Sequence, residues 1–387
     1  MDFAFTPEHE TLSRTLRQFA RKTLAPRSAE WDKSGEFPWD AWRQLGELGL
    51  LGLRIPPAYG GQDADYLTFG IAMEEIARGD FSCTYGLQLA GLAGEILGAN
   101  AGEEVKRRWL PPTARGEAVI ALALTEPGVG SDAANLACRA VRKGDEYVLT
   151  GEKSGISLGM VAQAAIVFAR TGGERARGVS AFVVDLDAPG VSRSALRDMG
   201  THAVRRAVIA FDGVRLPAAH RLGDEGQGFY QVMRGFDYNR IGIALACLGT
   251  AAESVEQTMA YVRERKAFGQ ALASFEGVSF AIAEAATHIE ACRWLCYRAL
   301  WLADQGQRHT KESAMTKWWA PRLAVETIHR CLLLHGHYGY TDELPFEQRL
   351  RDVIGLEIGD GTAEVMKMVV ARELLGRESL PYRLPPS

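Results

Sequence analysis

The sequence has no long hydrophobic run and almost no excess of charge of one sign. No stretch approaches the ~20 apolar residues that a membrane-spanning helix requires. The formal net charge is -4 over 387 residues, so neither nucleic acid nor an anionic membrane is expected as a partner. The first residues, MDFAFTPEHE, also lack the basic-then-apolar order of a signal peptide. We therefore expect a cytoplasmic protein.

Cysteine is scarce as well, and its spacing gives no sign of a metal site. The six cysteines are scattered without a CxxC pair, and we interpret them as reduced core residues. Hydrophobic residues make up 47% and charged residues 24% of the chain, as in an ordinary folded protein. The length is sufficient for two or three structural units.

What is present is a change of pattern along the chain. Helical periodicity runs from residue 6 to about 115, and short apolar β runs separated by turn residues follow between about 119 and 217. Long helical periods then return, as in 243–265 and 277–305. The pattern predicts an α+β multidomain chain. Its expected domains are an N-terminal helical domain at 1–117, a middle β domain at 118–228 and a C-terminal helical domain at 229–387.

The run LTEPGVGSD at 124–132 is the sharpest motif. Gly128-Val129-Gly130 looks like part of a dinucleotide fingerprint, but such a fingerprint needs a helix directly after it inside a βαβ unit. The residues after Asn135 have a strand-like pattern instead, so we do not expect a Rossmann fold that binds NAD. A tight turn with exposed backbone N–H groups and two hydroxyls, from Thr125 and Ser131, can hold an anion or a flavin edge.

Four ordered motifs carry a resemblance to the acyl-CoA dehydrogenase family. LTEPGVGSD is similar to the family's TEPGxGSD, and residues 265–269 (RKAFG) are similar to its RxxFG. Gly336 and Gly339 stand in its glycine-rich segment, and Arg351-Asp352 precedes its catalytic loop. The match covers nearly the whole chain. It implies that the middle domain is a β-barrel or β-sandwich and that the C-terminal domain is a four-helix bundle.

The resemblance implies FAD as the cofactor and a homotetramer that shares it between subunits. Leu124 and Thr125 would touch the isoalloxazine, Ser131 would lie near the FAD pyrophosphate and the thioester tail, and Arg265 would reach the pyrophosphate of a neighbouring subunit. The other implied cofactor residues are Gly130, Ser157, Phe268, Phe275, Gly336, Gly339, Thr362 and Glu364. Considered without the resemblance, Arg265 is more simply a solvated charge and Ser131 a turn residue.

The same resemblance supplies a candidate catalytic base. Removing hydrogens from Cα and Cβ of an acyl thioester needs a base for the α-proton and a hydride acceptor, which is flavin N5 in the family. Most members carry the base as Glu in a Glu-Gly-Thr sequence, and here the matching residues are Asp360-Gly361-Thr362. From local sequence alone, Asp360 between two glycines could merely form an Asx-turn. The alternative family position for the base is Asn239 here, which cannot accept a proton in this way.

Substrate residues follow from a further similarity. Residues 236–240 (FDYNR) resemble the helix start that contacts CoA, which would assign Asp237 and Arg240 to substrate binding. An Asp–Arg pair three residues apart is more often a surface ion pair. The other residues assigned to the acyl-CoA site are Ser131, Gly155, Gly359, Gly361 and Arg372.

Three departures from the family pattern bear on the acyl group. Gly155 replaces an aromatic residue that commonly covers the flavin, Leu158 replaces the usual Asn, and Gly359 replaces a large residue before the base. Each glycine could be only a turn residue. Together with the shorter Asp base, the missing side chains favour a wide acyl group, such as a cyclohexane- or cyclohexenecarboxyl-CoA.

Two other functions remain open at this stage. Nitroalkane oxidases share the architecture and use an Asp base without CoA, and a non-catalytic relative could bind FAD as a structural element. A DNA-associated relative is disfavoured by the -4 charge and by the lack of a basic C-terminal extension. For a dehydrogenase, an electron-transferring flavoprotein is the expected electron acceptor.

Overall fold

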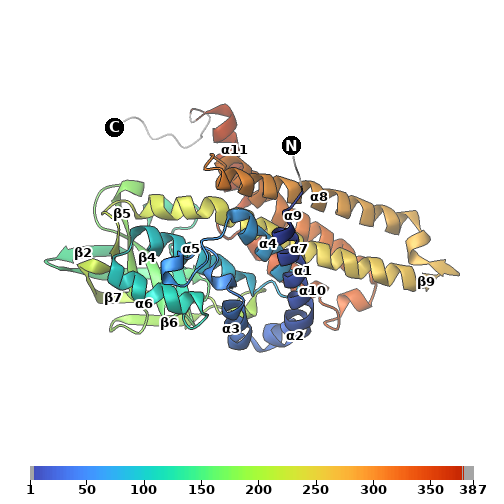
Figure 1. The fold of residues 1–387 in the computed structure, drawn as a ribbon, viewed down its shortest axis with the longest axis horizontal. Coiled ribbons are helices and arrows are strands. Elements are labelled where there is room, and N and C mark those ends of the chain that lie inside the picture. The colour runs from blue at the N-terminus through green and yellow to red at the C-terminus, as the bar shows by residue number, and fades with distance from the viewer. Residues whose placement is uncertain (1–3, 377, 379–387) are drawn as a thin grey trace. The chain divides into compact units, whose positions relative to one another are not determined.

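The computed structural model describes residues 4–376 and residue 378. Helices come first, a sheet occupies the middle and long helices complete the chain (Figure 1), so the predicted fold class is confirmed. The N-terminal helices are α1 (Pro7–Phe19), α2 (Ala25–Ser34), α3 (Trp39–Glu47), α4 (Tyr66–Ala77), α5 (Thr84–Asn100) and α6 (Glu103–Ala114). The C-terminal helices are α7 (Gly228–Glu264), α8 (Glu276–Asp304), α9 (Thr310–Leu334), α10 (Phe346–Ile354) and α11 (Ala363–Leu375).

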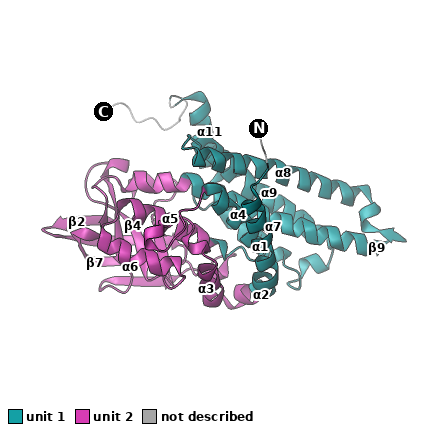
Figure 2. Ribbon diagram, in the orientation of Figure 1, with its two compact units in different colours: residues 1–29, 66–84, 237–387 teal, residues 30–65, 85–236 magenta. Residues whose placement is uncertain are grey.

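The chain forms two compact units that do not follow its linear order (Figure 2). Unit 1 contains residues 1–29, 66–84 and 237–387, and unit 2 contains residues 30–65 and 85–236. Within unit 1, α4 contacts both α1 and α8, so two of the N-terminal helices belong to the same core as the long C-terminal ones.

Unit 2 contains a mixed sheet whose most buried strands are the most apolar ones. The strands are β1 (Ile120–Ala123), β2 (Arg139–Lys143), β3 (Glu146–Ile156), β4 (Ala164–Arg170), β5 (Val179–Asp185), β6 (Val191–Ala195), β7 (Ala207–Pro217) and β8 (Arg221–Leu222). Their order is β6-β7-β3-β2-β4-β5-β8, with β1 pairing parallel to β4. In β4 and in β5, every residue except the last is buried, as expected for strands covered on both faces.

The segment after Gly130 continues as predicted. It forms a short 3-10 turn, η4 (Ala133–Asn135), and then strand β2. Because no α-helix follows the glycines, the rejection of a Rossmann fold is confirmed.

Unit 1 is built on the long helices α7, α8 and α9, and on close packing at small residues. A Cβ added to Gly70 of α4 would lie 2.2 Å from the side chain of Leu300, and one added to Gly242 of α7 would lie 2.5 Å from Phe69. Only glycine allows such approaches.

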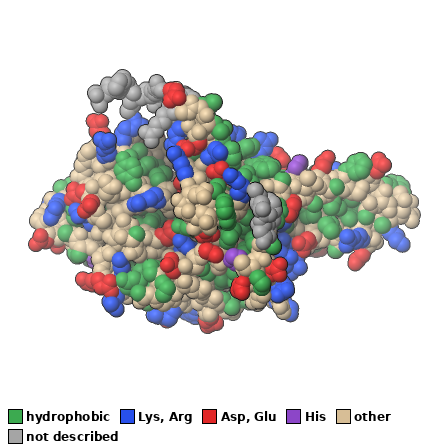
Figure 3. Space-filling view, turned by 45° about the horizontal axis from the view of Figure 1, so that its top comes forward, with side chains coloured by type: hydrophobic (Ala, Val, Ile, Leu, Met, Phe, Trp, Pro, Cys, Tyr) green, Lys and Arg blue, Asp and Glu red, His purple; other side chains and the backbone are tan. Residues whose placement is uncertain are grey.

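Apolar side chains also reach the surface along the long helices (Figure 3). Among the described residues, no helix is both long and apolar enough to cross a membrane.

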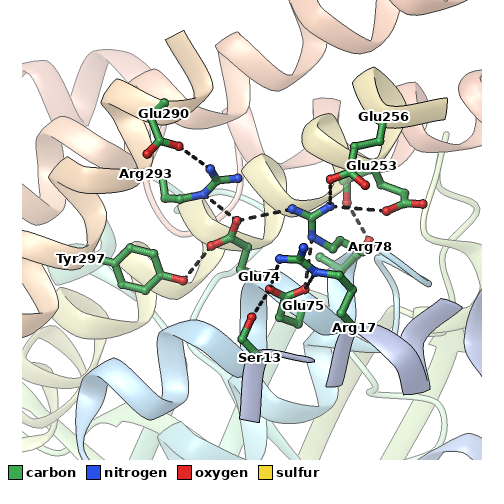
Figure 4. Close-up of polar contacts among 12 residues, drawn as sticks. Ser13, Arg17, Glu74, Glu75, Arg78, Glu253, Glu256, Glu290, Arg293 and Tyr297 are labelled. Atoms are coloured by element: carbon green, nitrogen blue, oxygen red, sulfur yellow. Dashed lines mark hydrogen bonds and ion pairs between the residues drawn. The ribbon is translucent and has the colours of Figure 1, made fainter. Parts of the chain in front are cut away.

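A cluster of buried charges also joins the helices of unit 1 (Figure 4). Its centre is Arg78, the residue directly after α4, which is 3% exposed and lies 3.2 Å from a Glu75 oxygen and 2.8 Å from one of Glu256 on α7. Arg17 of α1 donates to both oxygens of Glu75, at 2.8 and 2.7 Å. Arg293 of α8 extends the cluster, because its Nε donates to a Glu74 oxygen at 2.7 Å. We name these residues, together with Arg21 and Glu253, the α4 charge cluster.

The six cysteines all lie buried as free thiols, which agrees with their interpretation as reduced core residues. The sequence pattern missed one feature of unit 1. Strands β9 (Lys266–Ala267) and β10 (Gln270–Ala271) form a short hairpin between α7 and α8; β9 and the turn lie in the RKAFG motif and β10 directly follows it.

Candidate active site

Residues 124–131 leave the end of β1 as a closed turn, which we name the flavin loop. Glu126 and Val129 exchange two backbone hydrogen bonds, of 3.1 and 3.0 Å, and Ser154 N–H donates to the carbonyl of Thr125 at 2.9 Å. A Cβ added to Gly128 or Gly130 would meet no atom within 4 Å. The outer backbone of the turn is therefore open to a ligand, and the exposed Thr125 and Ser131 lie on it as predicted.

A buried ion pair anchors the flavin loop from behind. Lys153 of β3 is 0% exposed, and its ammonium donates to the Leu124 carbonyl at 2.9 Å and to the Glu126 carboxylate at 2.8 Å. The backbone N–H groups of Ala137 and Cys138 donate to the same carboxylate, at 2.6 and 2.9 Å. Burial alone would raise the pKa of Glu126, but Lys153 and these N–H groups lower it below its ordinary value. Neither Lys153 nor Glu126 was among the predicted site residues.

Two of the three departures from the family pattern, Gly155 and Leu158, lie after strand β3 or at its end, and each has a different backbone reason. Gly155 has φ of +70° and no atom within 4 Å of an added Cβ, so the backbone itself favours glycine there. Leu158 is a buried residue with φ of +60°, and its N–H donates to the Val204 carbonyl. Ser157 lies between them and is half-buried.

In unit 1, Asp360 lies on a strained segment between η10 (Gly355–Glu357) and α11. Asp360 has φ of +54° and Gly361 has φ of +107°, both in the region that disfavours most side chains. Thr362 then caps α11, because its hydroxyl accepts from Val365 N–H at 3.2 Å. Residues 356–361 are named the base loop below.

The Asp237–Arg240 pair of α7 is not a surface ion pair. Arg240 is 9% exposed, its Nη1 lies 3.5 Å from Asp237, and its Nε donates to the Asp360 carbonyl at 2.9 Å. The hydroxyl of Thr310 donates to the Asp237 carboxylate at 2.7 Å, and that of Ser313 to its carbonyl at 2.5 Å. Burial lowers the pKa of Arg240, against the opposing charges of Asp237 and Asp360. The structure thus brings three predicted site residues, Asp237, Arg240 and Asp360, together.

A second buried cation faces the base loop and was missed in the sequence. Lys317 of α9 is 1% exposed, and its ammonium donates to the carbonyls of Leu356 at 2.5 Å and Gly361 at 3.2 Å. Its signal in the sequence is a lone lysine in the mostly apolar run AMTKWWA. The pattern alone does not reveal what such a lysine contacts.

The remaining predicted residues of α11 have other partners. Arg372 Nη2 lies 3.1 Å from Glu373, and its charge also acts on Arg240. Glu364, in the first turn of α11, lies 3.6 Å from Lys367. Gly359 is not among the residues with positive φ, and an added Cβ would lie 3.5 Å from its nearest neighbour, the Gly355 carbonyl oxygen.

The other predicted cofactor residues of unit 1 lie far from the base loop in the same chain. Arg265 follows the end of α7, 25 residues beyond Arg240, which is about 37 Å along a helix. Figure 1 shows β9 at the opposite end of the long helices from α11. Phe268 in this hairpin is 96% exposed and has φ of +51°, and its ring meets that of Phe275 edge-on at 6.2 Å.

The two predicted glycines after α9 have backbone roles. Gly336 has φ of +62°, which favours glycine, and no atom lies within 4 Å of an added Cβ. At Gly339 an added Cβ would lie 2.0 Å from the Leu332 carbonyl oxygen, so the close packing excludes any side chain.

Comparison with known proteins identifies this architecture. The chain matches models of the acyl-CoA dehydrogenase N-terminal domain at residues 6–117, middle domain at 121–214 and C-terminal domain at 226–375. It is 37% identical over 383 residues to the probable acyl-CoA dehydrogenase YngJ of Bacillus subtilis, covering 97% of this chain and 100% of that protein. It is 35% identical to the caffeyl-CoA reductase-Etf complex subunit CarC of Acetobacterium woodii, covering 96% and 99%. The structure of butyryl-CoA dehydrogenase from Megasphaera elsdenii has a TM-score of 0.93, 32% identity, and coverage of 97% and 100%.

The fold and these matches define a flavin-dependent oxidoreductase. The chain belongs to the acyl-CoA dehydrogenase family, whose members use FAD to dehydrogenate acyl-CoA thioesters. The residues present fit that cofactor. The open glycines of the flavin loop leave backbone N–H groups accessible, and the exposed, strained Phe268 offers an apolar ring with no core to cover it.

Proposed function

We propose that this chain oxidises an acyl-CoA thioester with Asp360 as the base that removes the α-proton. The observation that carries the proposal is the convergence of Asp360 and Asp237 on the buried guanidinium of Arg240. Bound FAD supplies the acceptor for the β-hydride. The chain's own task is then to hold the Asp360 carboxylate beside the α-carbon and to accept its proton.

The backbone around Asp360 supports its role. Non-glycine residues with positive φ are uncommon and often occur at functional sites, where surrounding contacts hold them. Aspartate tolerates this conformation better than most residues, so an Asx-turn alone would explain φ of +54°. It would not explain why a buried guanidinium donates to the Asp360 carbonyl.

FAD contacts are proposed to come from two subunits. Leu124, Thr125, Gly130, Ser131 and Ser157 would contact it from one subunit. Arg265 lies roughly 37 Å from Arg240 along α7, and Phe268 lies in the hairpin beyond it, so both would serve a neighbouring subunit's cofactor. This arrangement requires an oligomer, which we propose to be a homotetramer, and light scattering after gel filtration measures it directly.

The acyl group is proposed to carry a ring or a branch. Gly155 supports this weakly, because its positive φ already accounts for a glycine. Gly359 supports it better, since neither its φ nor its neighbours exclude a side chain. One relative is a caffeyl-CoA reductase subunit, and a caffeyl group contains an aromatic ring, whereas a similar structure is that of a butyryl-CoA dehydrogenase. The alicyclic thioesters named above are our first candidates.

The proposed electron acceptor is an electron-transferring flavoprotein. The Acetobacterium woodii relative is a subunit of an Etf complex, which supports this choice. A nitroalkane oxidase would instead be reoxidised by O2 and release nitrite. Rapid reoxidation by an electron-transferring flavoprotein, with no response to O2 and no nitrite from nitroalkanes, separates the two functions.

The test of the base is anaerobic flavin reduction by a panel of CoA thioesters with the Asp360→Asn variant. Asparagine has the same shape and tolerates positive φ, so the loop should keep its conformation. We expect reduction to slow by roughly 10²–10⁴-fold with FAD still bound. Asp63→Asn is the matched control, because Asp63 also has positive φ, of +47°, on an exposed loop. Wild-type reduction rates in Asp360→Asn would refute the assignment.

A further inference from the structure

Lys317 is a buried cation that the proposed function does not use. Its ammonium donates to the carbonyls of Leu356 and Gly361, the first and last residues of the base loop. Burying an ammonium is costly unless hydrogen bonds compensate it. Both of these hydrogen bonds go to neutral backbone carbonyls. Stability alone therefore does not explain why a lysine is buried at this position.

Arg240 holds the same loop from another helix. Its Nε donates to the Asp360 carbonyl, so three carbonyls of the base loop accept from two buried cations, one on α7 and one on α9. These contacts surround the two residues with positive φ, Asp360 and Gly361. A strained backbone persists only where several surrounding contacts hold it in place. Hydrogen bonds from a charged donor are stronger than those between neutral groups, so the two cations are suited to this task.

We propose, resting on the assignment of Asp360 as the base, that Lys317 is a positioning residue that fixes the base loop by its carbonyls and so holds Asp360 in its reactive conformation. Lys317 itself does not touch the reacting atoms in this proposal. It acts through the backbone at both ends of the loop, while Arg240 acts at the middle. A displacement of about 1 Å at a reacting group can slow a reaction by 10²-fold, so such a clamp would affect the rate far more than substrate binding.

The titration of Lys317 gives the clamp a measurable signature. Burial lowers the pKa of Lys317 to about 8, against the opposing charges of Asp360 and Glu357; the charge of Arg240 on α7 lowers it further. These groups come from the base loop and from α7, the elements that face the ammonium. As the pH rises through 8 the ammonium loses its charge, so its hold on the two carbonyls weakens. The rate of flavin reduction should then fall.

Stability should change in the opposite direction over the same pH range. The pKa of Lys317 is about 8 in the folded protein against an ordinary 10.5, so between these values the unfolded chain binds more protons. The contribution of Lys317 to the free energy of unfolding therefore rises with pH from about 8 to 10.5. A lysine with a merely structural role would not lower the reduction rate while its own contribution to the free energy of unfolding rises.

The experiment compares the wild-type holoenzyme with Lys317→Met and Lys317→Gln. Methionine keeps the shape without a donor, and glutamine keeps a donor without the charge. Lys311→Met is the matched control, since Lys311 lies on the same helix with a half-exposed side chain. For each protein, FAD content, acyl-CoA binding and the anaerobic rate of flavin reduction are measured from pH 6 to 9.5.

We expect Lys317→Met to retain FAD, to bind acyl-CoA within about threefold of wild type, and to reduce its flavin roughly 10–100-fold more slowly. Lys317→Gln should lie between the two. The fall in wild-type rate near pH 8 should be absent from both variants. A wild-type reduction rate in Lys317→Met, or equal losses of binding and rate, would overturn the proposal.

Two further measurements keep the result interpretable. If Lys317→Met does not fold, the wild-type pH profile still decides, because a rate that does not fall between pH 8 and 9.5 contradicts the clamp. Asp360→Asn separates this inference from the proposed function. A slow Asp360→Asn with a fast Lys317→Met refutes only the clamp, whereas a fast Asp360→Asn refutes the base assignment on which the clamp depends.

Discussion

The Lys153 ammonium binds the flavin loop at two points, 2.8 Å from the Glu126 carboxylate and 2.9 Å from the Leu124 carbonyl. The Leu124 carbonyl and the Thr125 N–H belong to the same peptide group. A cation at the carbonyl polarises that group and makes the N–H a better donor. A buried ion pair thus fixes the part of the loop that we expect to contact the flavin, and influences its hydrogen bonding.

Removal of Lys153 should be more harmful than removal of the whole pair. Lys153→Met leaves the Glu126 carboxylate buried without its cation, which should lower the free energy of unfolding by about 3–5 kcal/mol and reduce FAD content. Glu126→Gln combined with Lys153→Met removes both charges and should recover much of that loss. Recovery should be incomplete, because Gln offers one acceptor oxygen to the N–H groups of Ala137 and Cys138.

Urea unfolding and FAD absorbance measure both effects. The control is Arg115→Met, since Arg115 pairs with Glu117 at 2.6 Å on the surface, where ion pairs contribute little. A double variant less stable than Lys153→Met would show that the two charges are not coupled as described.

From the α4 charge cluster we expect the loss of a buried arginine to destabilise the protein far more than the loss of a surface arginine. Arg78→Met removes the central cation and leaves Glu75 facing Arg17 alone, so we expect a loss of about 3–5 kcal/mol in the free energy of unfolding. Arg322→Met should leave stability unchanged, because Arg322 pairs with Glu326 on the surface. Equal unfolding midpoints for the two variants would contradict the central role of Arg78.

Asn239 is a position at which an apolar substitution should stabilise the folded protein. Its side chain is 0% exposed, and neither its amide nitrogen nor its oxygen has a hydrogen-bond partner among the residues that the structure describes. Unpaired buried polar groups cost about 1–3 kcal/mol each, so Asn239→Leu should raise the free energy of unfolding by about 1–2 kcal/mol. Thermal unfolding of the FAD-free protein measures it. A lower unfolding temperature would mean that the amide has partners in solution.

The fold could be predicted from the sequence because its patterns are local. The β runs at β4 and β5 and the helical periods of α7 and α8 are properties of neighbouring residues. Strand β6 was missed because VSRSA has little apolar character, and the β9–β10 hairpin was missed because each strand has only two residues.

The candidate site could be predicted only in part. Motifs identify Asp360 and the flavin loop, but the cations that hold them act over long separations. Lys153 lies 27 residues from Glu126, and Lys317 lies 44 residues from Gly361. The burial of the Asp237–Arg240 pair likewise depends on hydroxyls from α9, which no spacing within α7 reveals.

Gly359 provides the most direct test of the acyl group. Its backbone permits a side chain, and the nearest atom to an added Cβ is the Gly355 carbonyl oxygen at 3.5 Å, an ordinary contact. Gly359→Leu would therefore restore a large residue beside the base without backbone strain. If the site accommodates a ring, we expect kcat/KM for a cyclohexanecarboxyl-CoA to fall by at least about 10-fold, while that for butyryl-CoA stays within about threefold.

The matched control is Gly277→Leu, because Gly277 lies in the first turn of α8 and an added Cβ there would meet no atom within 4 Å. Gly155→Leu is a poorer test, since φ of +70° would add strain that lowers every rate alike. A parallel fall for ring-bearing and straight-chain thioesters in Gly359→Leu would mean that position 359 affects the base loop rather than the acyl group. The ratio of the two kcat/KM values, rather than either alone, therefore decides whether Gly359 makes room for a ring.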